Sequence, residues 1–231
     1  MTQKPLILSS LSSSEKLELI SLLEQREKIK SQNRLVDYKP YAKQREFHAA
    51  GKKYRERLFM AGNRCGKTQA GAYEMAFHLT GLYPDWWEGK RFESEISAWA
   101  SGVTGESTRD VVQEKLLGNP ASPEQRGTGS IPAKLIGNVS PARGVANGID
   151  SVMVQHVSGK WSTLQFKSYE KGREKWQGTA LHVIWLDEEC PLEIYTEALT
   201  RTNETGGIVY ITFTPLLGVT ELVHMFQETS V

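Results

Sequence analysis

A glycine-rich segment that ends in Gly-Lys-Thr carries the clearest chemistry in this sequence. Residues 61–68 read Ala-Gly-Asn-Arg-Cys-Gly-Lys-Thr, between an apolar stretch that predicts a buried strand and a stretch that predicts a helix start. A strand, a glycine turn and a helix in this order form a phosphate-binding P-loop. Lys67 can reach the β- and γ-phosphates of a nucleotide, and the Thr68 hydroxyl can ligate Mg²⁺. The predicted phosphate-binding residues are Gly62, Asn63, Arg64, Cys65, Gly66, Lys67 and Thr68.

The glycine spacing of this P-loop departs from the usual pattern at one position. The first glycine of the common motif falls on Ala61, and Gly62 follows one residue later. The departure at Ala61 should be harmless if Gly62 carries the turn, and Gly66 lets the backbone approach a phosphate closely. The alternative is a helix cap that binds no nucleotide, which the strand and helix around the segment disfavour.

An apolar run that ends in acidic residues supplies the second chemical motif. Residues 183–186 predict a strand buried on both faces, and Asp187 and Glu188 follow it as a Walker B element. Asp187 would hold Mg²⁺, and Glu188 would polarise the attacking water, with Glu189 as the competing candidate. The carboxyl ends of parallel strands meet at one sheet edge, so these carboxylates can reach Lys67 and Thr68. Together the two motifs indicate nucleotide hydrolysis.

Alternating strand and helix patterns between these motifs predict an α/β fold with a mostly parallel sheet. A turn at Ser158-Gly159 predicts a β-hairpin, and residues 119–130 read as a loop. The expected strands are residues 58–60, 96–100, 183–186 and 208–213, with hairpin strands 152–157 and 163–167; the expected helices are residues 40–50, 106–117 and one that begins at Pro191.

The first 35 residues look like a helical appendage to a domain that spans residues 36–231. Ser12 and Glu15 form a capping box, and Leu17, Ile20 and Leu23 recur at helical spacing. We expect a solvated arm packed on the main domain, which is favoured over a specific binding helix.

Composition indicates an ordered protein without a strong global charge. The 231 residues include 28 basic and 27 acidic residues, for a net charge of +1, so any DNA contact must come from local patches. Cys65 and Cys190 are expected to be reduced thiols in a cytosolic compartment. No apolar run approaches the roughly 18 residues that span a bilayer, and no signal peptide is visible.

Four segments in order resemble the large terminase subunit of tailed bacteriophages, from about residue 38 to the end of the chain. That family packages double-stranded DNA into empty capsids using ATP. The resemblance implies a three-layer P-loop NTPase with a RecA-like, mostly parallel sheet, acting in the host cytoplasm. The matching segments are Gln44-x-x-Phe47, residues 61–68, Trp-Leu-Asp-Glu-Glu at residues 185–189, and Thr-Phe-Thr-Pro-Leu-Leu-Gly at residues 212–218.

The resemblance also implies roles for individual residues. Glu188 is the catalytic carboxylate, assisted by Lys67 and by Arg64, which would sense or stabilise the γ-phosphate. Thr212 and Thr214 would couple hydrolysis to movement, against the alternative of ordinary β-propensity. Gln44 matches a glutamine that reads adenine, and its alternative is a solvent-facing helix residue.

In a ring motor a neighbouring subunit can supply an arginine in trans, and Arg173 is the candidate here. The alternative for Arg173 is a solvated loop charge. The implied partners are double-stranded DNA, the small terminase subunit and the portal protein, with a homo-oligomeric ring on the procapsid, a monomer in isolation and no membrane contact.

The family's large subunit normally continues into a nuclease, for which no second carboxylate constellation is present. We therefore expect a fragment that holds the Mg²⁺-dependent ATPase alone, from a parent protein that is also an endonuclease. Another P-loop motor, such as a helicase-like ATPase, or a nucleotide-regulated binding module remains the alternative, and the Thr-Pro-Leu-Leu-Gly segment favours a terminase.

Overall fold

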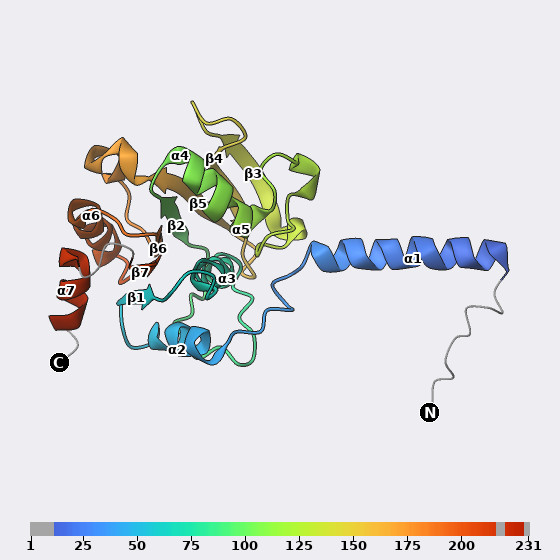
Figure 1. The fold of residues 1–231 in the computed structure, drawn as a ribbon, viewed down its shortest axis with the longest axis horizontal. Helices are drawn as coiled ribbons and strands as arrows, with labels where there is room; N and C mark the ends of the chain where they lie inside the picture. The colour runs from blue at the N-terminus through green and yellow to red at the C-terminus, as the bar shows by residue number, and fades with distance from the viewer. Residues whose placement is uncertain (1–11, 216–219, 229–231) are drawn as a thin grey trace.

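A computed structural model describes residues 12–215 and 220–228 of the chain. The chain is organised around one seven-stranded sheet (Figure 1). The strand order is β1-β7-β6-β2-β5-β4-β3. The first five strands in this order pair in parallel, whereas β4 pairs antiparallel with β5 and with β3. The predicted α/β class with a mostly parallel sheet and a hairpin is confirmed. The strands are β1 Glu56–Met60, β2 Ser97–Gly102, β3 Ile136–Pro141, β4 Ile149–Gln155, β5 Trp161–Ser168, β6 Val183–Asp187 and β7 Ile208–Phe213.

Helices connect these strands largely where the sequence predicts them. The helices are α1 Ser13–Ser31, α2 Ala42–Ala50, α3 Lys67–Thr80, α4 Gly105–Ser107, α5 Glu114–Leu117, α6 Leu192–Asn203 and α7 Glu221–Glu228. Short 3-10 turns lie at Pro123–Gln125, Ala133–Leu135, Tyr169–Lys171 and Arg173–Trp176. Between α4 and α5 the backbone forms a π-helix, η2, over Thr108–Gln113, so the predicted helix 106–117 is not uniformly α-helical.

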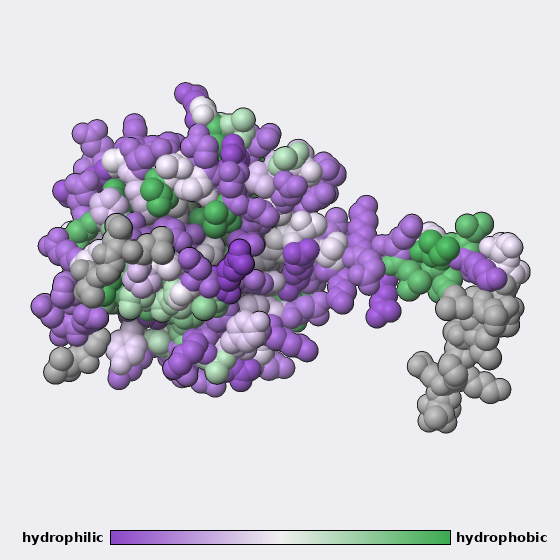
Figure 2. Space-filling model, in the orientation of Figure 1, coloured by the Kyte–Doolittle hydropathy of each residue, from purple (hydrophilic) through white to green (hydrophobic). Residues whose placement is uncertain are grey.

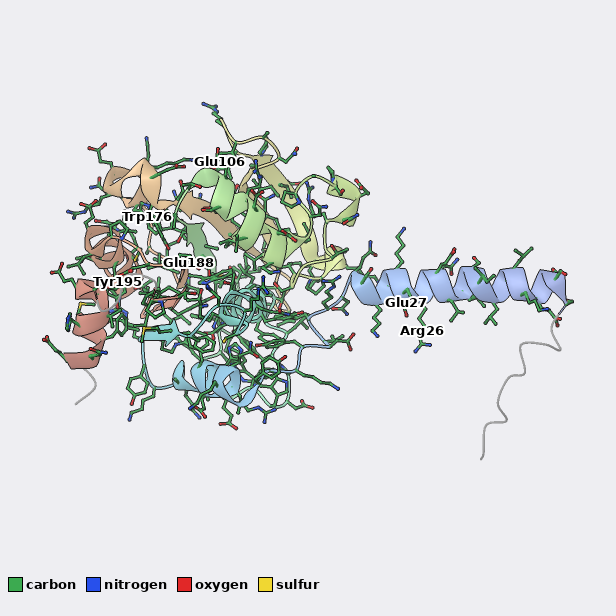
Figure 3. The ribbon with its side chains drawn as sticks, in the orientation of Figure 1. Arg26, Glu27, Glu106, Trp176, Glu188 and Tyr195 are labelled. Carbon is green, nitrogen blue, oxygen red and sulfur yellow. The ribbon has the colours of Figure 1, made fainter. Side chains whose placement is uncertain are left out.

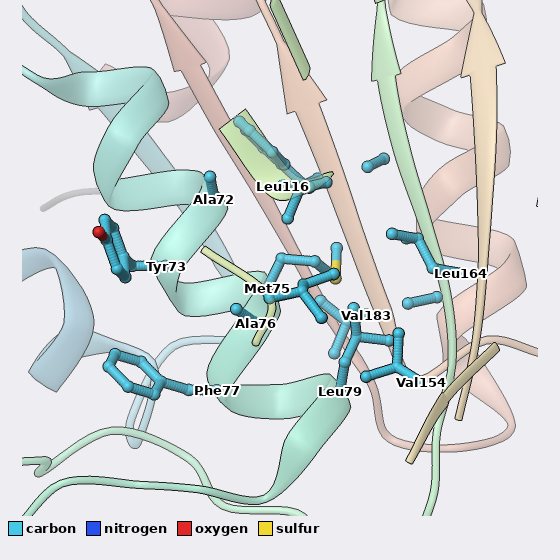
Figure 4. Packing of buried hydrophobic residues seen from close by; sticks show 14 of the residues in the cluster. Ala72, Tyr73, Met75, Ala76, Phe77, Leu79, Leu116, Val154, Leu164 and Val183 are labelled. Atoms are coloured by element: carbon cyan, nitrogen blue, oxygen red, sulfur yellow. The ribbon is translucent and has the colours of Figure 1, made fainter. Parts of the chain in front are cut away.

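Two hydrophobic clusters cover the two faces of the sheet. Successive residues of the central strands alternate between them: Val183 and Trp185 face the α3 side, whereas Ile184 and Leu186 face the α6 side. Helix α3 packs on the first face through Met75 and Leu79, among others (Figure 4). Every residue of β6 is buried, as expected for a strand covered on both sides. The sheet therefore gives the motif-bearing strand ends a rigid support.

Helix α1 differs from the predicted arm in one respect. The capping box is present, with the Glu15 N–H donating to the Ser12 hydroxyl at 3.3 Å. None of its residues is buried, and the helix projects away from the sheet, with apolar side chains exposed near its N-terminal end (Figures 1 and 2). The expected packing of the arm on the domain is therefore wrong. In the part of the chain that the structure describes, no helix is long and apolar enough to cross a bilayer.

Two elements lack a prediction from the sequence. Strand β3 is an exposed edge strand with register shifts against β4, so its residues show no alternation of apolar and polar side chains. Helix α7 follows residues 216–219, so Leu216, Leu217 and Gly218 of the predicted coupling segment lie outside the described residues. Leu222 and Val223 of α7 are buried in the α6-side cluster.

Candidate nucleotide site

The P-loop joins the end of β1 to the start of α3, as predicted, but its turn is made differently. Gly66 is the N-cap of α3 with φ of 75°, and Arg64 also takes a left-handed conformation with φ of 61°. Gly62 has no positive φ, and a Cβ there would meet only the Cys65 Sγ at 3.8 Å. Gly62 therefore does not carry the turn. The left-handed positions are Arg64 and Gly66, so Ala61 and Gly62 need no special conformation.

Lys67 occupies the centre of the loop and is almost fully buried. Its ammonium group donates to the Gly62 carbonyl at 3.0 Å and to the Thr214 hydroxyl at 2.8 Å. The Thr214 hydroxyl in turn donates to the Asn63 side-chain oxygen at 3.0 Å. Because Thr214 follows β7, the β7 end is linked directly to the P-loop. The first N–H groups of α3 have no intrahelical acceptor, which is the arrangement that receives a phosphate.

Asp187 brings the second motif to the same place. Its carboxylate accepts a hydrogen bond from the Thr212 hydroxyl at 2.6 Å, and Thr68 and Lys67 lie near enough to favour its charged form. Burial raises the pKa of Asp187 to about 7, with the Glu188 charge adding to the rise, although Thr212, Thr68 and Lys67 oppose it. A cation at this carboxylate would favour its charged form. The hydroxyl of Thr68 and the carboxylate of Asp187 are oxygen donors of the kind that Mg²⁺ prefers, so these residues fit the metal.

Glu188 adopts a strained backbone conformation at the end of β6. Its φ is 64°, and its N–H donates to the Thr212 carbonyl at 2.8 Å. The Tyr169 hydroxyl donates to the Asp187 carbonyl at 2.9 Å and to the Glu188 carbonyl at 3.3 Å. Strand β7 and the turn after β5 therefore both hold Glu188, which is labelled in Figure 3. A left-handed glutamate persists only where the surroundings fix it, and such strain concentrates at functional sites. The neighbouring Glu189 instead accepts a hydrogen bond from the Thr220 hydroxyl.

Gln44 lies against the P-loop, and the solvent-facing alternative is wrong because the side chain is buried. Its amide nitrogen donates to the Gly66 carbonyl at 2.9 Å, and its amide oxygen accepts from the Tyr41 N–H at 2.9 Å. An amide offers two N–H donors and two acceptor lone pairs, so one of each remains for a further contact. Helix α2 is thereby tied to the N-cap of α3.

The two arginines singled out from the sequence occupy different surroundings. Arg64 is exposed within the P-loop. Arg173 lies in the 3-10 turn after β5, where its Nε is 3.1 Å from the Glu197 carboxylate of α6, and its side chain is about half exposed. Arg201 contacts the other oxygen of Glu197, also at 3.1 Å. Arg173 therefore has a partner within its own chain.

The structure adds supporting contacts that the sequence did not indicate. The Trp185 indole N–H donates to the Thr212 hydroxyl at 2.8 Å, which fixes the direction in which that hydroxyl donates to Asp187. Tyr169 and Asn63 hold the Walker B turn and Thr214 in the same way. Trp185 belonged in the sequence to an apolar run and to a segment of the family resemblance, neither of which indicated this contact, and no sequence signal marks Tyr169.

Comparisons with known proteins agree with this arrangement. The family described as "Terminase large subunit, T4likevirus-type, N-terminal" matches residues 58–230. The chain is 41% identical over 239 residues to the large terminase subunit of Salmonella phage P22, covering 96% of this chain and 48% of that protein. It is 29% identical over 236 residues to the large terminase subunit of Enterobacteria phage LP7, covering 96% and 50%.

A solved structure also shares the fold. The large terminase from a thermophilic bacteriophage matches with a TM-score of 0.50 and 15% identity, over 76% of this chain and 39% of that chain. This chain spans about half the length of the curated relatives. The family match over most of the chain, joined to the 41% identity with the P22 protein, shows that the chain belongs to the large terminase subunits of tailed phages and contains their N-terminal region.

Proposed function

We propose that this chain is the ATP-hydrolysing motor domain of a DNA-packaging terminase, a three-layer, RecA-like P-loop NTPase that moves double-stranded DNA into a procapsid. The observation that carries the proposal is the junction of three motifs. The Asp187 carboxylate lies near Thr68 and Lys67 of the P-loop and accepts a hydrogen bond from Thr212 of β7, while Lys67 donates to Thr214 just after β7. Such an arrangement holds phosphate, metal and water around one point.

Each residue has a role that follows from its position. Lys67 binds the β- and γ-phosphates, and Arg64 stabilises the γ-phosphate from within the loop. Thr68 and Asp187 hold Mg²⁺, which when bound neutralises phosphate charge that develops during hydrolysis. Glu188 orients and activates the attacking water, because its carboxylate can accept a proton. Gln44 uses its remaining donor and acceptor to read the adenine edge.

Thr212 and Thr214 couple the chemistry to movement. When Lys67 turns to a phosphate, its hydrogen bond to Thr214 must change, and the change reaches the end of β7 directly. A cation at Asp187 alters the Thr212 contact in the same strand. Strand β7 leads toward α7, whose first turn is held by the contact between Thr220 and Glu189. Nucleotide state is thereby transmitted to the segment that follows the sheet.

The assembled motor would be a homo-oligomeric ring on the portal protein of the procapsid, in the host cytoplasm, with the small terminase subunit as a further partner. Arg173 would act in trans at the contact between subunits only if it leaves Glu197. The isolated chain, with a net charge of +1, is a monomer that binds DNA weakly. Avidity in the ring then supplies the grip, and the complete protein also carries an endonuclease.

The decisive experiment compares ATP turnover with and without duplex DNA for the unmodified chain, Glu188→Gln and Glu189→Gln. Glu188→Gln keeps ATP binding and loses about 10²–10⁴-fold in turnover, since an amide cannot take the proton of the water. Glu189→Gln is the matched control and has a mild effect. Near-normal turnover in Glu188→Gln would refute the assignment of the catalytic carboxylate. ATP turnover that duplex DNA does not change would count against the motor.

A further inference from the structure

The sheet edge that carries the nucleotide site continues beyond it to a second, basic feature. Asp187 ends β6, Gly102 ends β2 and Ser168 ends β5, and these strands are parallel. Strand β4 is antiparallel to β5, and β3 is antiparallel to β4, so the turn over residues 142–148 between β3 and β4 lies at this same edge. The turn projects beyond the sheet near α4 (Figure 1).

A cleft lies between this turn, the η2 π-helix and the end of β5. It encloses about 340 Å³, including the space open to solvent, and Arg109, Lys167 and Lys171 are among its lining residues. Arg109 donates to the Ala146 carbonyl at 2.9 Å. Gln113 donates to the Asn147 carbonyl at 3.0 Å and accepts from the Ile149 N–H at 2.8 Å. The π-helix therefore holds the turn in place, and π-helical segments are frequent at functional sites.

The charges around the cleft are unevenly balanced. Its charged lining residues are three basic ones, Arg109, Lys167 and Lys171, and one acidic one, Asp150. Asp110 neutralises Arg109, and Asp150 also lines the cleft. Arg143, on the turn, and Lys171 are exposed, and no carboxylate lies within ion-pair distance of either among the described residues.

These charges stand on the rim of the cleft rather than deep inside it. Lys167 is partly buried above the Trp99 ring, at 4.6 Å, and donates to the Lys175 carbonyl at 3.2 Å. The aromatic rings near the cleft, Phe166 and Trp99, are buried, so they offer no face on which a base could stack. Exposed cations without a stacking platform suit a polyanionic backbone that is contacted independently of sequence.

We propose that this cleft and the turn beside it contact phosphates of duplex DNA, with Arg143 and Lys171 as the principal cations. The inference rests on the proposed motor function and assigns it a DNA-contacting surface. Because the surface shares a sheet edge with Asp187 and Glu188, a shift of the strand ends during hydrolysis moves the DNA contacts with it. A net charge of only +1 gives the whole chain little general attraction for DNA, and this local patch of cations would supply the contact instead.

The test is a salt titration of duplex DNA binding by the 231-residue chain, followed by fluorescence anisotropy of a labelled duplex. The variant carries Arg143→Ala and Lys171→Ala. The matched control carries Lys52→Ala and Lys53→Ala, two exposed lysines that precede β1 at the opposite side of the sheet. We expect the slope of log K against log salt to fall by about 2 in the variant, because each phosphate contact contributes about 0.9. The control keeps the slope, and both keep the DNA-free ATP turnover.

Four outcomes are separable. An unchanged slope in the variant, or an equal change in the control, overturns the assignment of this surface. The proposed motor function survives that result if duplex DNA still stimulates ATP turnover. An unmodified chain that binds no duplex even at low salt overturns both this inference and the DNA part of the proposed function. If the unmodified chain self-associates on sedimentation, contrary to the expected monomer, and the variant does not, while DNA binding is unchanged, the face is instead a contact between copies of the chain and the proposal is overturned. If thermal melting shows the double variant to be unfolded, Lys171→Gln alone is expected to reduce the slope by about 0.9, and an unchanged slope refutes the proposal.

Discussion

Helices α1 and α3 show how differently two segments of one chain can be specified. Helix α1 has 19 residues, a complete capping box and no buried residue. Helix α3 has 14 residues, of which twelve are buried, and no side chain caps its N-terminus. Local hydrogen bonds define α1, whereas contacts with the sheet define α3.

The contacts of α3 leave little tolerance for change. Gly71 lies so close to β6 that a Cβ there would be 2.6 Å from the Trp185 ring. Glu74 is fully buried and meets Arg57 of β1, His48 of α2 and His78 of its own helix. Helix α3, which positions the P-loop, is therefore held in place by β1 and by α2. Four predictions test this contrast, from the largest expected effect to the smallest.

Glu74→Leu should have the largest effect on stability. The change leaves the Arg57 guanidinium buried without its carboxylate, and breaking a buried ion pair costs about 3–5 kcal/mol. Urea unfolding measures the loss. Glu18→Leu, an exposed position on α1, is the matched control and should leave the midpoint unchanged. Equal stability of the two variants would remove the contrast between the helices.

Lys67→Ala should weaken ATP binding while sparing the fold. A hydrogen bond to a charged group contributes about 1.5–3 kcal/mol, which corresponds to a roughly 10- to 100-fold loss of affinity. Isothermal titration with ATP and Mg²⁺ measures it, and turnover should disappear with binding. Lys16→Ala on α1 serves as the control. Unchanged affinity in Lys67→Ala would favour a helix cap without a nucleotide.

Acid should destabilise the domain through the same buried cluster. Burial lowers the pKa of His78 below its usual 6.5, although the hydrogen bond to Glu74 opposes the shift. The unfolded chain therefore binds the extra proton, and stability falls as the pH drops below about 6.5. Burial opposes ionisation of Glu74, but Arg57 and the two histidines outweigh it and hold its pKa well below 4.5. Its contribution is therefore lost only at still lower pH.

The groups that face this cluster are Arg57, His48, His78, Tyr38 and Tyr83. We expect the free energy of unfolding in urea to be lower at about pH 5 than at about pH 7, and His78→Asn to show a smaller difference. A chain without α1 should show the full difference. The same pH dependence in His78→Asn would place the titrating group elsewhere.

Removal of residues 1–31 should have the smallest effect. No residue of α1 is buried, so the unfolding free energy of the domain should change by less than about 0.5 kcal/mol. Gln32 is kept because its carbonyl accepts the Ala133 N–H at 3.0 Å. Circular dichroism should lose helical signal while the thermal midpoint stays constant. A shift of several degrees would show that α1 supports the domain after all.

Motifs made the sheet and its site largely predictable, because each couples a residue pattern to one geometry. Lys67, Thr68 and Asp187 were predicted to meet at one sheet edge, and they do. The hairpin and the buried β6 strand followed from their apolar patterns.

The remaining features depend on tertiary contacts that leave no local pattern. Strand β3 is an exposed edge, the η2 segment has a periodicity too close to that of an α-helix, and the left-handed Arg64 replaces an expected glycine turn. Tyr169 reaches the Walker B turn only because β5 and β6 end at the same sheet edge.

The pairing of β1 has a consequence for the synthesis of this protein. Within the described residues β1 hydrogen-bonds to β7 alone, from Glu56 opposite Val209 to Met60 opposite Phe213. Lys67 and Thr214, which join across the site, are 147 residues apart. Such distant partners meet late, because loop closure precedes their contact. A nascent chain therefore carries the P-loop sequence long before that loop can make its contacts with the end of β7, and the candidate nucleotide site is complete only after the ribosome has passed β7.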